Sequence, residues 1–308
     1  MNSKAVQFPC LRYKIGDVRL YKSGQVPGYE WSKRWNSNIS DAIHHWASPD
    51  TRSIHISDGY YEIELQVRQF VPQNGDKLER TWAHGGTKQS VSIPPYALTS
   101  LDDGRHAYQQ HIDQSTAMNP ALQKLLKEPD GLLHKTYDQA ICVMMDPNTS
   151  PECRELLMLT LRLWKYIRLS TKSGFIVGQE TLGMSPQILD ETNPLHGKVP
   201  LPPVLGAQLD VILTHHIQVP LRRRVLDLLQ KLILKNKPSC WFVTYLVIFI
   251  WLHNAALITA HDASYARKHG MRVSESLSHS SESHKQGLRG ENQSGQVSGL
   301  GPDLVGYY

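Results

Sequence analysis

The sequence is poor in cysteine and has no closely spaced cysteine pair. Its 308 residues include four cysteines, and no two of them stand in Cys-x-x-Cys spacing. Such scatter excludes a disulfide framework and a complete cysteine-based zinc site, and it favours a reducing compartment. The four are Cys10, Cys142, Cys153 and Cys240.

Targeting and catalytic signatures are also missing. The N-terminal MNSKAVQFPC lacks the apolar core that a secretory signal needs, so we expect a nuclear or cytoplasmic protein. The chain has no GxSxG nucleophile turn, no GxxxxGK phosphate loop followed by Ser or Thr, no HExxH metal motif and no GxGxxG after a strand. We therefore predict that this chain is not an enzyme.

The net charge is mild, but its distribution is uneven. The chain carries 33 basic and 28 acidic residues, a formal charge of +5. Basic and aromatic residues alternate along residues 1–48, as in Trp31-Ser32-Lys33-Arg34-Trp35. Such a segment either stacks on nucleobases and follows a phosphate backbone, or packs its aromatics on the next domain while its basic groups stay solvated. The second interpretation is favoured.

A small antiparallel sheet is predicted over residues 49–98. Between Tyr61 and Val71 the apolar residues alternate with polar ones, as in a half-buried strand. Thr51 to Ser57 and Gln89 to Ile93 are expected to be its partner strands. Asp58-Gly59 and Gly85-Gly86 are turn signals, and Pro94-Pro95 is expected to close the sheet.

The remainder is expected to be helical over residues 99–272. Helices are predicted at Asp102 to Gln114, at Pro120 to Lys127 and from Pro151, with Ser150 as the N-cap. An amphipathic helix is predicted at Pro220 to Asn236, with Arg222, Arg223 and Arg224 largely opposite its apolar stripe. Residues 273–308 are rich in Ser and Gly and are predicted to be a disordered tail.

The run Trp241 to Leu252, WFVTYLVIFIWL, leaves two locations open. With the following residues to Ala260 it is barely long enough to span a bilayer. His253 and Asn254 would then need polar partners inside the membrane, which is costly. We therefore expect a helix that is apolar all round and central to a soluble bundle, with a membrane anchor over residues 241–260 as the alternative.

Several strings resemble fungal transcription regulators that carry an N-terminal binuclear zinc cluster. They cover most of the chain from Phe8 to Gly270, and LRLWKYIRLSTKSGFIVGQETLGM and AHDASYARKHG are examples. The resemblance implies regulation of RNA polymerase II transcription in the nucleus. It also implies a six-cysteine cluster that binds two zinc ions and places a short helix in the DNA major groove.

The chain departs from that pattern at the cluster itself. Only Cys10 corresponds to a cluster cysteine, the last one, and one thiolate cannot hold zinc in four-coordinate geometry. We expect either that the N-terminus is truncated or that the protein pairs with intact relatives. The resemblance also implies further helices where this chain has its Ser/Gly-rich stretch, so apolar faces of the helical part are expected to need a partner.

Together these observations predict an α+β protein, the regulatory region of a fungal-type transcription factor. It is expected to act through protein or effector contacts, to bind DNA only weakly or indirectly, and to need no cofactor of its own, whereas the intact family binds zinc. Its expected partners are transcription-regulatory proteins or intact relatives, and it is expected to form a homodimer or a heterodimer. We expect it in the nucleus, without association with a membrane.

Overall fold

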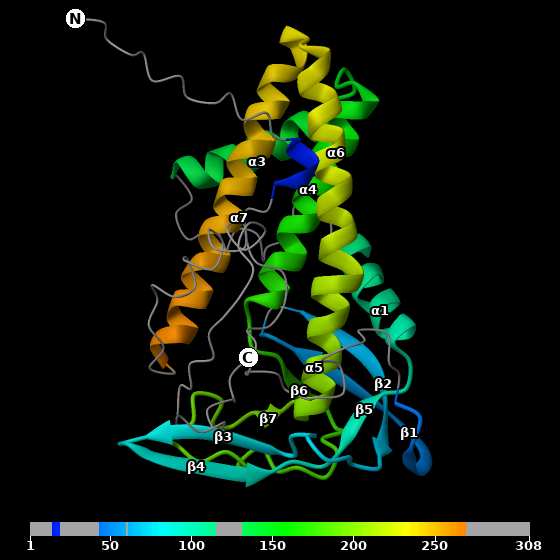
Figure 1. The fold of residues 1–308 in the computed structure, drawn as a ribbon, viewed down its shortest axis with the longest axis vertical. Helices are drawn as coiled ribbons and strands as arrows, with labels where there is room; N and C mark the ends of the chain where they lie inside the picture. The colour runs from blue at the N-terminus through cyan, green and yellow to red at the C-terminus, as the bar shows by residue number, and fades with distance from the viewer. Residues whose placement is uncertain (1–13, 19–42, 60, 115–130, 269–308) are drawn as a thin grey trace, which may run out of the picture.

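A small β layer lies at one end of the molecule, and long helices extend away from it (Figure 1). The computed structural model describes residues 14–18, 43–59, 61–114 and 131–268. The strands are β1 (Trp46–Ser57), β2 (Glu62–Phe70), β3 (Glu79–His84), β4 (Thr87–Ser92), β5 (Tyr96–Leu98), β6 (Phe175–Val177) and β7 (Val199–Pro200). The helices are α1 (Leu101–Gln114), α3 (Leu132–Met145), α4 (Pro151–Ser170), α5 (Pro203–Val211), α6 (Val219–Lys235) and α7 (Trp241–Lys268).

The main sheet is antiparallel and has the strand order β5-β2-β1-β6-β7. The predicted alternation in β2 is observed, since Ile63, Leu65 and Val67 are buried and the residues between them are exposed. Gly59, with φ +94°, makes the predicted turn between β1 and β2. The α+β fold class is therefore confirmed.

Val71 was expected to continue the buried side of β2, and that expectation is wrong. The strand ends at Phe70, and Val71 is 47% exposed while its N–H donates to the His45 carbonyl at 2.9 Å. Phe70 lies on the opposite face of the sheet, where it packs with Ile43, Ala97 and Val204. Both faces of this end of the sheet are thus covered.

The second half of the predicted sheet is arranged differently. Gly85 and Gly86 adopt φ +55° and +79°, and their two-residue turn pairs β4 with β3 in a separate hairpin instead of with β2. Pro94-Pro95 does not close the sheet either. The Pro95 carbonyl accepts a hydrogen bond from the Phe70 N–H at 2.9 Å, and this leads the chain into β5, which pairs with β2.

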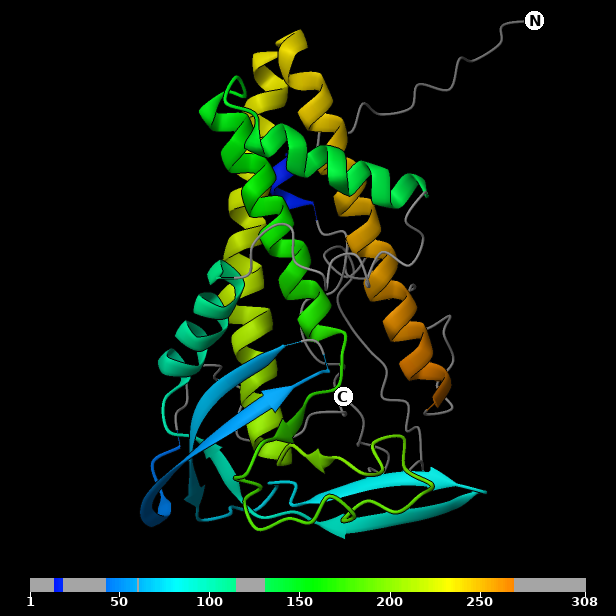
Figure 2. The ribbon, with the colours of Figure 1, turned by 180° about the vertical axis from the view of Figure 1, so that it is seen from behind.

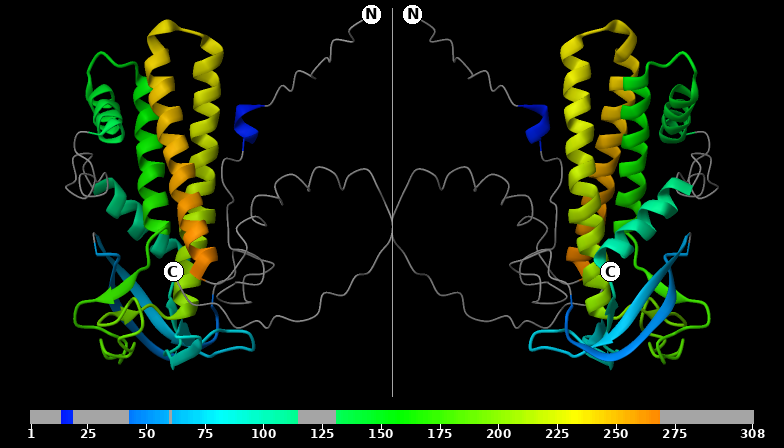
Figure 3. Two further views of the ribbon diagram at one scale, coloured as in Figure 1. Left: turned by 90° about the vertical axis from the view of Figure 1, so that its left-hand side faces the viewer. Right: turned by 90° about the vertical axis from the view of Figure 1, so that its right-hand side faces the viewer.

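Helix α4 begins where the sequence predicts. The Ser150 hydroxyl accepts a hydrogen bond from the Cys153 N–H at 3.4 Å, and Pro151 occupies the first turn, where its missing N–H costs nothing. Leu156, Leu157 and other apolar residues of α4 are then buried among α3, α6 and α7. Figure 3 shows α4, α6 and α7 standing side by side above the strands.

Helices α5 and α6 are joined by π-helical turns at Ile212–Gln218. Pro220 follows and has no N–H to donate to a carbonyl one turn earlier, so the regular ladder is interrupted there. The Gln218 amide donates to the Tyr166 carbonyl at 3.1 Å and to the Ser170 hydroxyl at 3.0 Å. The irregular turns are thereby fastened to α4.

Two principal hydrophobic clusters build the interior. One lies between the main sheet and helices α1 and α5 and includes Ile54, Leu65, Tyr108 and Leu205. The other fills the helical bundle and includes residues of α3, α4, α6 and α7. The predicted domain boundaries at residues 48, 98 and 272 stay predictions. The helix expected at Pro120 to Lys127 and the tail over residues 273–308 lie outside the described residues.

Leu157→Ala is expected to lower the free energy of unfolding by about 2–5 kcal/mol, because it opens a cavity in the fully buried centre of the bundle. Met158→Ala, one residue further and 46% exposed, should change it by less than about 0.5 kcal/mol. Urea denaturation followed by circular dichroism measures both. Equal effects of the two substitutions would contradict the central position of α4.

Candidate interaction surface on helix α7

The run Trp241 to Leu252 forms the first half of α7, and only one side of this helix is buried. Val243, Leu246, Val247 and Ile250 belong to the bundle core. The first half of this helix is apolar all round, as expected. The expectation that it is therefore central to the bundle is wrong, because one apolar side stays exposed. Helix α7 lies along the edge of the bundle in both views (Figure 1, Figure 2), because α4 takes the central position.

The other side of α7 exposes large apolar and aromatic side chains. Trp241 is 65% exposed and Leu252 is 59% exposed. We call this set the α7 face, and it consists of Trp241, Phe242, Tyr245, Ile248 and Leu252. Phe242, Tyr245, Ile248 and Leu252 recur at intervals of three and four, and Trp241 lies four positions before Tyr245, so the set lines one side of the helix. Ile233 and Leu234, at the end of α6, are also exposed.

Aromatic contacts along α7 give this face a defined shape. The rings of Phe242 and Tyr245 are stacked with centroids 6.4 Å apart, and Tyr245 and Phe249 follow at 6.1 Å. The exposed side chains of the α7 face present on the order of 600 Å² of surface. The largest apolar patch on a typical monomer measures about 300–600 Å², so this surface lies at the top of that range. No Asp, Glu, Lys or Arg occurs between Trp241 and Ala260.

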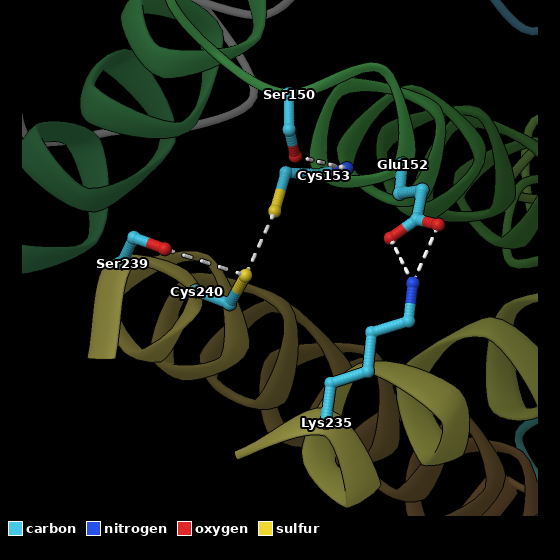
Figure 4. Close-up of polar contacts among 6 residues, drawn as sticks. All are labelled: Ser150, Glu152, Cys153, Lys235, Ser239 and Cys240. Carbon is cyan, nitrogen blue, oxygen red and sulfur yellow. Dashed lines mark hydrogen bonds and ion pairs between the residues drawn. The ribbon is translucent and has the colours of Figure 1, made fainter. Parts of the chain in front are cut away.

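Polar contacts join the start of α4 to the end of α6 and to the turn before α7 (Figure 4). Lys235 at the end of α6 pairs with Glu152 at 2.6 Å, and this partner lowers the pKa of the Glu152 carboxyl. The sulfur atoms of Cys153 and Cys240 lie 3.7 Å apart, and burial raises the pKa of the Cys153 thiol. The end of α6, the start of α4 and the start of α7 thus meet at one point.

The polar residues in the middle of α7 face the protein. The Tyr137 hydroxyl and His253 Nδ1 are 2.7 Å apart, and the Tyr137 ring packs against Trp164 at 5.0 Å between centroids. Burial lowers the pKa of His253 and so does the charge of Arg168, while burial raises the pKa of Tyr137. The Tyr137 hydroxyl and the neutral His253 imidazole therefore share a hydrogen bond. Asn254 beside them is fully buried.

The three consecutive arginines of α6 differ in their burial. Arg222 is buried, which corrects the expectation that all three lie opposite the apolar stripe. The reason is helical geometry, since Arg222 precedes the buried Val225 and Leu226 by three and four positions. Arg223 is exposed, and Arg224 pairs with Glu155 at 2.8 Å.

The metal residue expected from the sequence, Cys10, lies outside the described residues, as does most of the basic aromatic arm over residues 1–48. Within the described ranges, no group of three His, Cys, Asp or Glu residues is placed to hold a metal ion. The α7 face and the Cys153–Cys240 contact were both missed in the sequence. The face carried a signal, the helical spacing of its aromatics, whereas no spacing links cysteines 87 positions apart.

His253→Gln is expected to make the stability of the protein less dependent on pH between about pH 7 and pH 5.5. The native pKa of His253 is lowered, so the unfolded chain takes up a proton first and the native state loses stability as the pH falls. Glutamine keeps a hydrogen-bond acceptor for Tyr137 and cannot be protonated.

Urea midpoints measured at the two pH values test this expectation, with His106→Gln on the exposed side of α1 as the control. His111 and His215, whose pKa values burial also lowers, contribute equally to both variants. An unchanged pH dependence in His253→Gln would refute the role of its burial.

Comparison with known proteins places these features in a family. A family model described as KpeA transcription factor matches residues 21–286. The chain is also similar to the satratoxin biosynthesis SC3 cluster transcription factor SAT20 of Stachybotrys chartarum, with 20% identity over 260 residues. That alignment covers 81% of this chain and 34% of the relative, so the chain spans about a third of the relative's length. No solved structure matches it significantly.

The family model covers well over half of the chain, and the resemblance to fungal transcription regulators, without the zinc cluster's cysteine spacing, is confirmed. The chain belongs to the KpeA transcription factor family.

Proposed function

We propose that this chain is the regulatory region of a fungal RNA polymerase II transcription factor that acts in the nucleus through protein contacts. It has no complete zinc-cluster DNA reader and no catalytic role of its own. The observation that carries the proposal is the α7 face, a continuous apolar surface on the edge of a well-packed bundle. Surfaces of this size on soluble proteins mark sites of association.

The partner that this face fits best is a second copy of the chain. The exposed apolar surface of the α7 face, on the order of 600 Å², approaches the roughly 800 Å² that each partner contributes to a standard stable interface. Two copies related by a twofold axis present the same surface to each other. Because residues 241–260 contain no Asp, Glu, Lys or Arg, the α7 part of such a pairing brings no like charges together.

Membrane association is the second candidate. Among the described residues, one helix, Pro238–Ser264, is long and apolar enough to cross a bilayer by length and composition. Two observations favour the protein partner. Insertion would strip Val247 and Ile250 from the bundle core. It would also expose to lipid the His253 that Tyr137 contacts, at a cost of a few kcal/mol.

Tyr245→Asp combined with Ile248→Asp is expected to weaken self-association by at least about 100-fold, since a charge must then be buried on each side of the interface. Sedimentation velocity of the purified full chain over a concentration series, in high salt without detergent, measures it. Val71→Asp, at the exposed position that follows β2, is the matched control and should leave the dimer intact.

A wild-type chain that stays monomeric at all concentrations, or a double variant that dimerises normally, would refute the second copy as partner. Recovery of the chain only with detergent would support the membrane candidate instead. A separate assay tests the regulatory role. The chain is fused to an unrelated DNA-binding domain, and transcription of a reporter gene is measured. The wild-type chain should change the output and the double variant should not.

A further inference from the structure

We propose that Cys153 and Cys240 form a thiol–disulfide modification site, in which a hydroperoxide converts the two buried thiols into a disulfide that ties α4 to the start of α7. The two sulfur atoms are 3.7 Å apart and come from residues 87 positions apart in the chain. A disulfide bond is about 2.05 Å long, so the sulfurs need to approach by less than about 2 Å. Figure 4 shows the two side chains pointing toward each other from α4 and from the turn before α7.

The surroundings keep the thiols near each other. Cys153 lies in the capped first turn of α4, where its N–H is bound by the Ser150 hydroxyl. Cys240 ends the 3-10 turn Pro238–Cys240, and its N–H donates to the Lys237 carbonyl at 2.9 Å. The Glu152–Lys235 ion pair joins the same two parts of the chain. The backbone on both sides of the pair is therefore held in place, which lowers the entropy lost when the bond forms.

Burial sets the order of the two steps. Both residues are buried, and Cys240, 8% exposed against 3% for Cys153, is taken as the first to meet the oxidant. The Cys240 thiol attacks the hydroperoxide, which gives a sulfenic acid and releases an alcohol, or water when the oxidant is hydrogen peroxide. The Cys153 sulfur then displaces water from that sulfenic acid and forms the disulfide. Two thiols are oxidised by two electrons, and one peroxide bond is reduced.

The disulfide would lie immediately before the α7 face in the chain. Trp241, the first residue of that face, follows Cys240 in the chain. A covalent bond at Cys240 prevents the start of α7 from separating from α4 and holds the aromatic residues in their described orientation. If the α7 face binds a second copy, as proposed above, oxidation favours the state that binds it. The disulfide itself can form whether or not that partner exists.

The experiment uses the full chain with Cys10→Ser and Cys142→Ser, which removes the other two thiols. The reduced protein is treated with hydrogen peroxide, alkylated under denaturing conditions and digested. Mass spectrometry should find the Cys153 and Cys240 peptides joined, with the loss of two hydrogens and reversal by dithiothreitol. The melting temperature should rise by about 5–10 °C on oxidation and return on reduction.

Adding Cys153→Ala to the same background is the control, and it should abolish both the joined peptide and the rise in melting temperature. The peptide mapping requires no substitution within the pair, so it decides the question even if that control folds poorly. Unmodified thiols, sulfinic acid without a disulfide, or disulfides only between molecules would each overturn the proposal. The self-association measurement is made on fully reduced protein, so the failure of either proposal is seen independently of the other.

Discussion

Helix α4 is the element against which α3, α6 and α7 all pack, and the helical half of the molecule depends on its burial. The buried side chains of α4 point in several directions and meet α3, α6 and α7. Burial of that surface stabilises the bundle by the hydrophobic effect, at about 25 cal/mol per Å². The Ser150 cap fixes where α4 begins. Near the C-terminal end of α4, the Tyr166 carbonyl accepts a hydrogen bond from Gln218, which holds the π-helical turns after α5 in place.

The central position of α4 also determines what α7 can do. One helix occupies the centre, so the other apolar helix lies at the edge and buries only the side that faces α4. The side that remains is a row of aromatic and aliphatic residues without charge. The same helix therefore buries Val247 and Ile250 in the core and leaves Tyr245 and Ile248 exposed. Membership of a transcription-factor family gives this surface a regulatory context.

Several predictions that were made from local sequence patterns were confirmed. The period-two pattern of β2, the turn at Gly85-Gly86 and the N-cap at Ser150 depend on residues close together in the chain, and all three are observed. The pairing of β4 with β3 was not predicted, because the sequence pattern of a strand does not indicate which other strand it pairs with. Arg222 was assigned to the wrong side of α6 because its charge was given more weight than its helical position beside Val225.

The sequence by itself determined the fold class, the helices with their capping residues and the absence of closely spaced cysteine ligands, because each depends on neighbouring residues. Only the tertiary structure decided which side of α7 is exposed and that Cys153 meets Cys240. A helix that is apolar all round has no preferred side until another helix packs on it. Two thiols far apart in sequence likewise become neighbours only when packing between α4 and α7 brings their ends together.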